Sequence, residues 1–334
     1  MRYLRMRYLV TGGAGFVGSH VVLALAERGH HLVVLDNLKQ GHHAAVPAGV
    51  RLIEADLADA GAVDAALAAG PWDGVLHFAA LSLVGESMRV PFRYLIENGL
   101  NGIRLIEACV RHGVPRFILS STANLFGTPE SVPIAEGARL DPGSPYGESK
   151  WMIERALLWA GRVHGLRGGC LRYFNAAGAD PEGRIGEDHA PETHLIPLAI
   201  DAALGRRPPL EVFGTDYPTP DGTCIRDYVH VSDLADAHLR TLERLEHGSV
   251  TYNLGNGAGY SVLEVIAAVE RVAGRKVPRV LGQRRAGDPA VLVASAERIR
   301  RETGWRPCFE RLEDIVATAY AWRLAHPEGY ADLV

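Results

Sequence analysis

The sequence contains few cysteines, and their positions suggest neither a disulfide framework nor a metal site. Its 334 residues include four, Cys109, Cys170, Cys224 and Cys308, which are widely scattered and form no CxxC pair. This usage is typical of reduced thiols in the cytoplasm, where we expect the protein to be located. The adjacent histidine pairs 30–31 and 42–43 are expected to be solvated loop residues, and we expect no metal site.

Long apolar runs and an excess of either charge are also absent. No run reaches 18 apolar residues, so we expect no membrane span. The start, MRYLRMRYLV, has no long apolar core or cleavage site, which argues against a signal peptide; its repeat makes Met6 an alternative translation start. A net charge of −4 gives no polyanion-binding signature, so nucleic acid is not an expected partner.

A glycine-rich turn follows the first apolar strand. Residues 8–11 lead into Gly12, Gly15 and Gly18, and a helical pattern continues to residue 28. Glycine permits a tight turn and close approach of a diphosphate to the free N–H groups at a helix N-terminus. Asp36 ends the next strand, where its carboxylate can accept hydrogen bonds from an adenosine ribose and would repel a 2′-phosphate. The arrangement predicts NAD rather than NADP as the cofactor.

Strands and helices then alternate along the first half of the chain. Apolar strands are expected at residues 50–54, 74–80 and 116–119, with a long helix at 91–112 between the last two. This pattern predicts an α/β fold, a doubly wound parallel (Rossmann) sheet. The texture becomes rich in Gly and Pro after residue 178, so we expect an NAD-binding domain at 1–178 and a smaller α/β substrate domain at 179–334. Residues 228–245 are expected to pack back on the first domain.

The stretch from Ser120 to Lys150 contains the groups that alcohol oxidation requires. Thr122 lies at the carboxyl end of a strand, the edge of a parallel sheet where ligands bind. Tyr146 and Lys150 lie four residues apart at the start of a helix, so their side chains leave the same face. A free tyrosine has a pKa of about 10. We expect Lys150 and the nicotinamide charge to lower that value and make Tyr146 a base.

These segments together resemble the extended short-chain dehydrogenases that act on nucleotide sugars. The resemblance covers nearly the whole chain, through TGGAGFVGSH, HFAA, SST, SPYGESK, LRYFNAAGADP, the run at 213–238, YNLGNG and RRAGD. It implies interconversion of UDP-galactose and UDP-glucose by reversible oxidation at C4, with NAD and a homodimer. The dehydratases of this group carry an acidic pair after the threonine; Ala123 and Asn124 stand there, which argues against dehydration.

The resemblance also assigns the site residues. The catalytic group comprises Thr122, Tyr146 and Lys150. The expected NAD contacts, including those inferred from the glycine turn, are Gly12, Gly15, Phe16, Val17, Gly18, Asp36, Asn37, Asp56, Leu57, Phe78, Ala79, Ala80, Asn98, Ser120, Tyr146, Lys150 and Tyr173. The expected UDP-hexose contacts are Thr122, Phe174, Asn175, His194, Leu195, Phe213, Arg226, Tyr228, Arg285, Asp288 and Leu292.

Some residue assignments and activities remain open from sequence alone. Asn98 either contacts the cofactor or is a solvated helix residue, and His77 is expected to be a core histidine. His194 replaces a common asparagine, and Leu292 occupies a position that limits the sugar pocket. A 4-epimerase for UDP-N-acetylhexosamines, UDP-pentoses or UDP-glucuronate is therefore an alternative. A non-catalytic NAD-binding regulatory protein is the alternative from another class.

Overall fold

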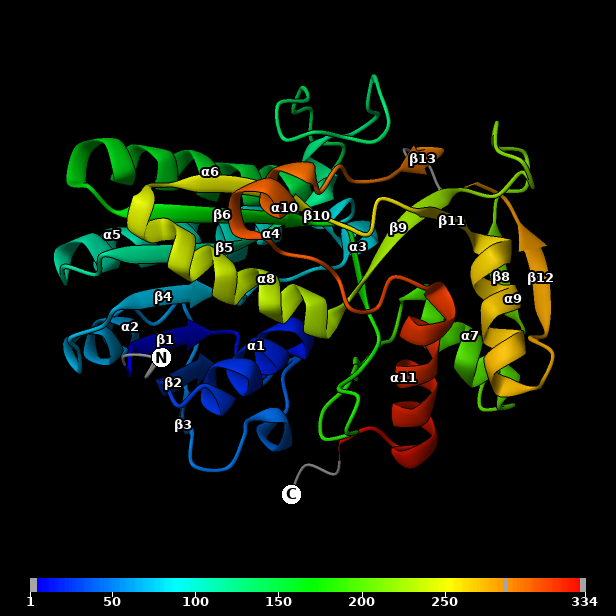
Figure 1. Ribbon diagram of the computed structural model, residues 1–334, viewed down its shortest axis with the longest axis horizontal. Helices are drawn as coiled ribbons and strands as arrows, with labels where there is room; N and C mark the ends of the chain where they lie inside the picture. Colours follow the sequence, from blue (N-terminus) through cyan, green and yellow to red (C-terminus); the bar gives the residue numbers. More distant parts are fainter. Residues whose placement is uncertain (1–4, 285–287, 331–334) are drawn as a thin grey trace.

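A seven-stranded parallel sheet forms the centre of the larger part of the molecule (Figure 1). The computed structural model describes residues 5–284 and 288–330. The strand order is β10-β6-β5-β4-β1-β2-β3, so the predicted doubly wound parallel sheet is confirmed. The strands are β1 (Arg7–Thr11), β2 (His31–Asp36), β3 (Arg51–Glu54), β4 (Gly74–His77), β5 (Arg116–Thr122), β6 (Arg167–Tyr173) and β10 (Val250–Leu254).

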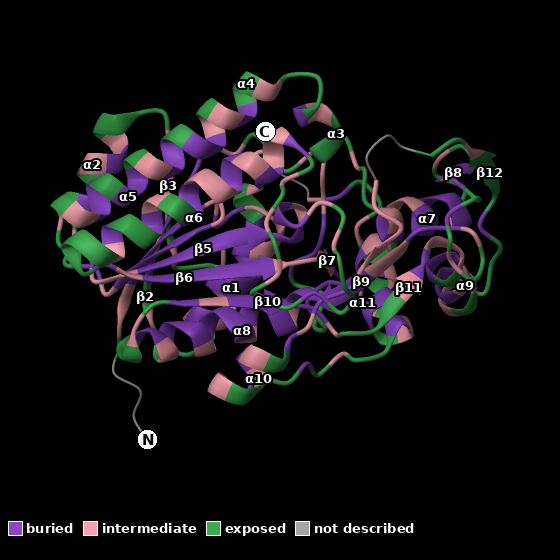
Figure 2. Ribbon diagram, turned by 90° about the horizontal axis from the view of Figure 1, so that it is seen from above, coloured by how far each residue is buried: buried purple, intermediate pink, exposed green. Residues whose placement is uncertain are grey.

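Helices cover both faces of this sheet, as Figure 2 shows. One face is covered by α1 (Phe16–Glu27), α8 (Val231–Arg244) and α10 (Glu297–Thr303). The other face is covered by α2 (Ala60–Ala68), α5 (Asn101–Arg111) and α6 (Pro145–His164). Successive strand residues point to opposite faces, so in β1 Val10 packs with the first set and Leu9 with the second. Both side chains are fully buried, which explains the near-continuous apolar strands of the sequence.

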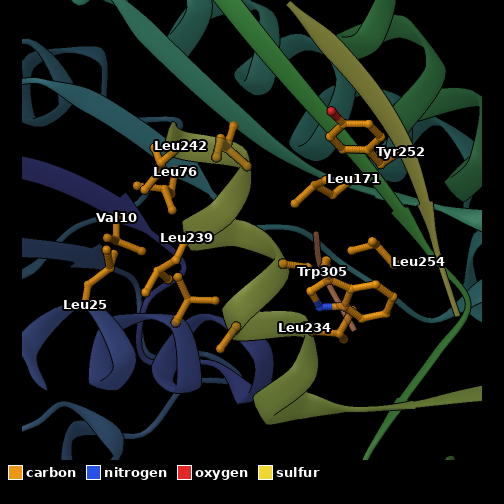
Figure 3. Packing of buried hydrophobic residues seen from close by; sticks show 14 of the residues in the cluster. Val10, Leu25, Leu76, Leu171, Leu234, Leu239, Leu242, Tyr252, Leu254 and Trp305 are labelled. Atoms are coloured by element: carbon orange, nitrogen blue, oxygen red, sulfur yellow. The ribbon is translucent and has the colours of Figure 1, made fainter. Parts of the chain in front are cut away.

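Helix α8 returns from the smaller part of the molecule to the large sheet. Figure 3 shows Leu239 of this helix near Val10 and Leu25, Leu242 near Leu76, and Leu234 beside Trp305. The following strand, β10, then pairs in parallel with β6, with Val250 opposite Gly169. Residues well beyond 178 thus complete the large sheet and its core, while the position of the domain boundary stays a prediction.

The smaller part is built on β9 and three helices. Strand β9 (Ile225–His230) lies between β11 (Gly259–Ser261) and β13 (Val291–Leu292), also pairs with β7 (Asn175–Ala177), and a separate pair joins β8 (Leu210–Phe213) to β12 (Arg279–Gly282). The helices α7 (Leu195–Ala203), α9 (Val262–Ala273) and α11 (Leu312–Ala325) share one apolar core. Helix α9 begins at a reciprocal capping box formed by Ser261 and Glu264.

The long helix predicted at 91–112 is interrupted by a π-helical segment. It comprises α4 (Pro91–Tyr94), a π-helical segment η2 (Leu95–Leu100) and α5. Such wide turns occur most often at functional sites, and η2 carries the buried Asn98. The remaining short elements are α3 (Val84–Ser87), η1 (His43–Ala45), η3 (Ala123–Leu125) and η4 (Leu245–His247). Within the described residues, no helix is both long and apolar enough to cross a membrane.

Candidate functional site

The glycine turn connects β1 to α1 at the carboxyl edge of the sheet. Gly12 has a φ of +73°, and a Cβ there would lie 2.2 Å from the backbone N of Ala79. A Cβ on Gly18 would lie 2.1 Å from the Gly12 carbonyl oxygen, so this glycine lets α1 approach the turn. Both positions therefore require glycine for backbone packing.

The beginning of α1 is suited to a diphosphate. Its N-cap is Gly15, which provides no side-chain cap, and its first turn carries no acid. A Cβ at Gly15 would meet only the Gly12 carbonyl oxygen, at 3.5 Å. The backbone N–H groups at the start of α1, from Phe16 and Val17 onward, are thus accessible to the phosphates of NAD.

The turn lies where the strand order reverses, between β1 and β4. Phe78 and Ala79 both donate their backbone N–H to the Thr11 carbonyl, at 2.7 and 3.0 Å. This brings the expected NAD contacts Phe78, Ala79 and Ala80 directly beside Gly12. Dinucleotides bind in the crevice at such a reversal point.

Asp36 is held by the backbone at the end of β2. Its carboxylate accepts hydrogen bonds from the N–H groups of Ala14 and Leu38, both at 3.0 Å. Burial raises the pKa of Asp36, although these backbone hydrogen bonds oppose the shift. The fixed acid lies against the glycine turn, as the NAD prediction requires.

Asp56 lies two residues beyond Glu54, the residue paired with Asp36 in the β2–β3 register. It accepts hydrogen bonds from Asn37 at 2.8 Å and Lys39 at 2.9 Å. The hydrogen bond from the Ala58 backbone N–H, followed by that from Lys39, lowers the pKa of Asp56 to about 2. Asp56 is thus ionised, and together with the adjacent Leu57 it forms a partly exposed rim of the expected NAD site.

Thr122, Tyr146 and Lys150 meet at the carboxyl end of β5. The Thr122 hydroxyl hydrogen-bonds to the Tyr146 phenol, and Lys150 is buried one turn further along α6. Helix α6 begins at this point because Ser144 caps it, its hydroxyl accepting from the Gly147 N–H at 3.1 Å. Asn124 donates to Thr122 Oγ1 from its backbone N–H and its side chain, at 3.1 and 3.2 Å.

Burial shifts the pKa values of both Tyr146 and Lys150 in the chain without NAD. Burial raises the pKa of Tyr146 in the chain itself, and the hydrogen bond from Thr122 only opposes that shift. Burial lowers the pKa of Lys150 to about 8. In the chain without NAD, desolvation of the phenol dominates, and the lowering expected from Lys150 together with the nicotinamide charge stays a prediction.

Two further NAD candidates form polar contacts beside this group. The Ser120 hydroxyl and the Tyr173 phenol are hydrogen-bonded to each other. Of the two alternatives for Asn98, the solvated helix residue is excluded because this residue is only 1% exposed, and the NAD contact stays a prediction. Its side chain donates to the Leu81 carbonyl at 2.9 Å and accepts from the Leu81 N–H at 2.8 Å. Asn98 thereby fixes the chain that follows β4.

His77 lies below this edge, in β4. Its Nδ1 lies 2.8 Å from the Thr11 hydroxyl, and the residue is 1% exposed. Burial, and secondarily the charge of Lys150, lower its pKa to about 3. It is therefore a neutral, buried histidine.

Sequence reasoning missed a buried ion pair beneath β5. Arg172 and Glu154 form two hydrogen bonds, at 2.9 and 2.6 Å, and Ser121 donates to the same carboxylate at 2.6 Å. Both charged side chains are more than 90% buried. The pair fixes α6 and β6 to the strand that ends in Thr122. Arg172, the last but one residue of the otherwise apolar end of β6, was the signal in the sequence.

The substrate candidates lie across the carboxyl edge from the glycine turn. Arg226 forms an ion pair with Asp288, and Leu292 lies opposite Arg226 in the β13–β9 pairing. Leu292 and Phe174 both pack against the small buried cluster of Ala123, Phe126 and Ile134. Asn175 donates to the Asp227 carbonyl at 2.9 Å. The structure thus brings the substrate candidates Arg226, Asp288 and Leu292 together, and their contacts with the nucleotide stay predictions.

Four other substrate candidates have different surroundings. Tyr228 is buried in β9, Leu195 begins α7, and Phe213 ends β8. The His194 Nδ1 lies 2.9 Å from a Glu192 carboxylate oxygen. Arg285 lies outside the described residues.

Asp227 is a second residue that sequence reasoning missed. Its carboxylate accepts hydrogen bonds from three backbone N–H groups, those of Asn256, Gly257 and Ala294, at 2.9, 3.0 and 3.0 Å. Burial raises the pKa of Asp227 to about 6 against these bonds. It joins β9 to the loops that carry the substrate candidates, and its place in the motif IRDY was the available signal.

Comparison with known proteins identifies the family. Residues 8–255 match the model of the NAD dependent epimerase/dehydratase family. The chain belongs to this family. It is 51% identical to a UDP-glucose 4-epimerase of Azospirillum brasilense over 318 residues, covering 95% of this chain and 91% of that protein. The family and these relatives establish an NAD-dependent epimerase enzyme.

Solved structures agree with this family assignment. The chain is 42% identical to a UDP-glucose 4-epimerase from Brucella ovis in complex with NAD, with a TM-score of 0.91 and coverage of 95% of this chain and 98% of the other. A UDP-glucose 4-epimerase from Bifidobacterium longum in complex with NAD+ and UDP is 34% identical, with a TM-score of 0.93 and coverage of 97% and 100%. The similarity extends over both the large sheet and the smaller part.

Proposed function

We propose that this enzyme interconverts UDP-galactose and UDP-glucose by reversible oxidation at C4. The carrying observation is the hydrogen bond between Thr122 and Tyr146 at the carboxyl end of β5, with Lys150 buried on the same helix. These groups lie at the sheet edge where the glycine turn offers a diphosphate site. The high identity to UDP-glucose 4-epimerases over the whole chain supports the same reading.

Each residue of the catalytic group has one proposed task. Bound NAD supplies the hydride acceptor. Tyr146 takes the proton of the sugar C4 hydroxyl, and Thr122 holds the same oxygen and orients the proton. Lys150 stabilises the phenolate through its positive charge. The same NAD, when bound, would give the hydride back to the other face of C4 after the 4-keto sugar turns over, and Tyr146 would return its proton to the C4 oxygen.

The residues after Thr122 favour epimerisation over loss of water. Elimination requires an acid to protonate a leaving hydroxyl. Ala123 and Asn124 occupy those positions, and the Asn124 amide donates to Thr122 rather than supplying a proton. Dehydration therefore lacks its acid here.

The remaining predicted residues form the proposed binding surfaces. NAD lies along the glycine turn, the Asp36–Asp56 rim, the segment 78–80 and the residues around Ser120. Arg226 binds the diphosphate of the UDP-sugar, and Asp288 exchanges its ion pair for a ribose hydroxyl. Leu292 and Phe174 limit the space for the sugar.

A direct assay tests this function. Purified enzyme is incubated with UDP-galactose, with and without added NAD, and UDP-glucose is followed by chromatography. We expect the two sugars to reach equilibrium, and we expect a Tyr252→Phe control, which removes a phenol bonded to Glu302 elsewhere, to behave as wild type. No UDP-glucose even with NAD, or a dehydrated 4-keto product, would refute the proposal.

We also propose that two copies pair through α4, η2 and α6. These adjacent helices expose large apolar side chains that a monomer would leave in water: Phe92, Ile96, Leu100, Trp159 and Val163. Light scattering should give twice the chain mass, and Phe92→Glu should give a monomer. Leu281→Glu, at an exposed apolar residue on β12, is the matched control.

The compartment we propose is the cytoplasm. Cys109 and Cys170 are buried free thiols, and burial raises the pKa of both, which makes them unreactive. Cell fractionation against marker enzymes tests this assignment, and recovery in a secreted fraction would contradict it.

A further inference from the structure

Four potential ligand side chains converge in the loop that precedes α7. They are Glu187, His189, Glu192 and His194, and one ligand atom from each lies within 4.8 Å of all the others. The His194 Nδ1 lies 2.8 Å from a Glu187 oxygen and 2.9 Å from a Glu192 oxygen. The His189 Nδ1 lies 3.4 and 3.5 Å from oxygens of the same two carboxylates. Two imidazoles and two carboxylates thus face a common centre.

Three of these inward-facing atoms lack the hydrogen bonds that buried polar atoms normally make. Glu187 Oε1, His189 Nδ1 and Glu192 Oε2 are each shielded from solvent, and none forms a hydrogen bond of good geometry among the described residues. Their contacts are the ion-pair distances given above, and Glu187 is only 4% exposed. A buried carboxylate oxygen without a well-aligned hydrogen bond is costly. Glu187 Oε1 is directed into the cluster, which indicates that a ligand binds between these four side chains.

The spacing of the atoms fits a tetrahedral metal. Zinc binds imidazole nitrogen and carboxylate oxygen at about 2.0–2.2 Å, which places neighbouring ligand atoms of a tetrahedron about 3.4 Å apart. Glu187 Oε1 lies 2.8 Å from the His194 Nδ1 and 3.4 Å from the His189 Nδ1. Glu192 presents one oxygen to His194 at 2.9 Å and the other to His189 at 3.5 Å, and one ligand atom from each of the four residues lies within 4.8 Å of the others. Magnesium and calcium prefer all-oxygen shells, so two nitrogens disfavour them. We propose that Glu187, His189, Glu192 and His194 bind one zinc ion.

A four-ligand site of this kind is structural rather than catalytic. The loop that would hold the ion contacts both parts of the molecule. The His189 ring lies edge-on to Phe16, the first residue of α1, with ring centres 6.3 Å apart. Trp322 of α11 donates to the Glu187 carbonyl at 3.2 Å, and Gln40, just after β2, donates to the Ala190 carbonyl at 3.1 Å. Zinc would fix this loop between the glycine turn and α11.

The arrangement was not predicted because the earlier expectation considered only histidine pairs. The four residues occupy eight consecutive positions with the spacing E-x-H-x-x-E-x-H. They lie in a loop, so no helical or strand periodicity predicts that their side chains converge. His194, one of the substrate candidates, turns its Nδ1 toward the carboxylates of this cluster.

Metal analysis of untagged enzyme tests the site. The enzyme is stripped with a chelator, exposed to zinc, dialysed and analysed by mass spectrometry for zinc per chain. We expect one zinc per wild-type chain and an affinity at least about 100-fold lower for His189→Gln and Glu192→Gln, because losing a ligand costs more than losing an outer-shell partner. His247→Gln, at an exposed histidine outside the cluster, should bind as wild type.

Two readouts on the wild-type chain keep the test valid if a variant fails to fold. X-ray absorption should show nitrogen and oxygen neighbours with two imidazoles, and the melting temperature should rise with zinc but not with magnesium. Sulfur neighbours would place the zinc at a cysteine instead. That result, less than one zinc per chain, or equal binding by the ligand variants would overturn the proposal and leave only a set of histidine–carboxylate ion pairs.

Discussion

Lys150→Met should make the NAD-free protein more stable while removing its activity. Burial lowers the pKa of Lys150 from 10.5 to about 8, and no offsetting charge contributes to that shift among the described residues. Each pKa unit corresponds to 1.36 kcal/mol, so keeping the ammonium charged in the fold costs about 3 kcal/mol at pH 7. Methionine has a similar length and no charge, so it removes this cost.

The sign of the pH dependence follows from the lowered pKa. Between pH 8 and 10.5 the unfolded chain binds the Lys150 proton and the folded chain has lost it, so wild-type stability rises with pH. The gain of Lys150→Met over wild type should therefore be complete below pH 8 and fade by pH 10.5. Urea unfolding at pH 7, 9 and 10.5 measures this gap.

The control for this experiment is Lys276→Met. The Lys276 ammonium pairs with Glu270 at 2.8 Å, but its side chain is 89% exposed. It should change stability little at any of these pH values. A Lys150→Met protein that is less stable at pH 7, or whose gain does not change with pH, would refute the reasoning.

Three other substitutions test the catalytic edge and its support. Tyr146→Phe should lower kcat about 10²–10⁴-fold, the usual contribution of a proton-transferring group, while the NAD content after purification stays near that of wild type; near-normal turnover would exclude Tyr146 as the base. Glu154→Gln should lower the free energy of unfolding by about 3–5 kcal/mol in urea, because Arg172 keeps a buried charge without its partner; a cost below about 1 kcal/mol would show that water reaches the pair. Arg226→Met should raise KM for UDP-galactose at least about tenfold with little change in kcat, since a charge-assisted hydrogen bond is lost; an unchanged KM would exclude the diphosphate contact.

The glycine turn could be predicted because its constraints are local. Gly12 requires a left-handed φ and Gly18 a missing Cβ, and both needs are visible in the spacing between one strand and one helix. The same holds for α6, which has Ser144 as N-cap and Gly165 in the left-handed conformation at its end. Short-range backbone chemistry therefore suffices to predict the glycine turn and the start of α6, while the individual NAD contacts stay predictions.

Contacts between distant segments could not be predicted in this way. Strand β10 joins the sheet at β6 only after the chain has formed β7, α7, β8 and β9 of the smaller part, and its five residues carry no signal of parallel pairing. Glu154 and Arg172 lie 18 residues apart, on a helix and the following strand, so their bidentate pairing depends on how α6 crosses β6. The domain boundary near residue 178 and the individual substrate contacts stay predictions for the same reason.

The buried acids at this edge have hydrogen-bonding partners, whereas the buried Lys150 has no compensating charge among the described residues. This difference indicates where the fold loses stability. Glu154 beneath β5 is paired with Arg172, and the Asp36 carboxylate is held by two backbone N–H groups. Lys150 is buried as deeply but shows no compensating contribution to its pKa. A fold selected for stability alone would replace such a lysine with an apolar residue. Its retention next to Tyr146 follows if the phenolate formed during the reaction is the anion that offsets its charge.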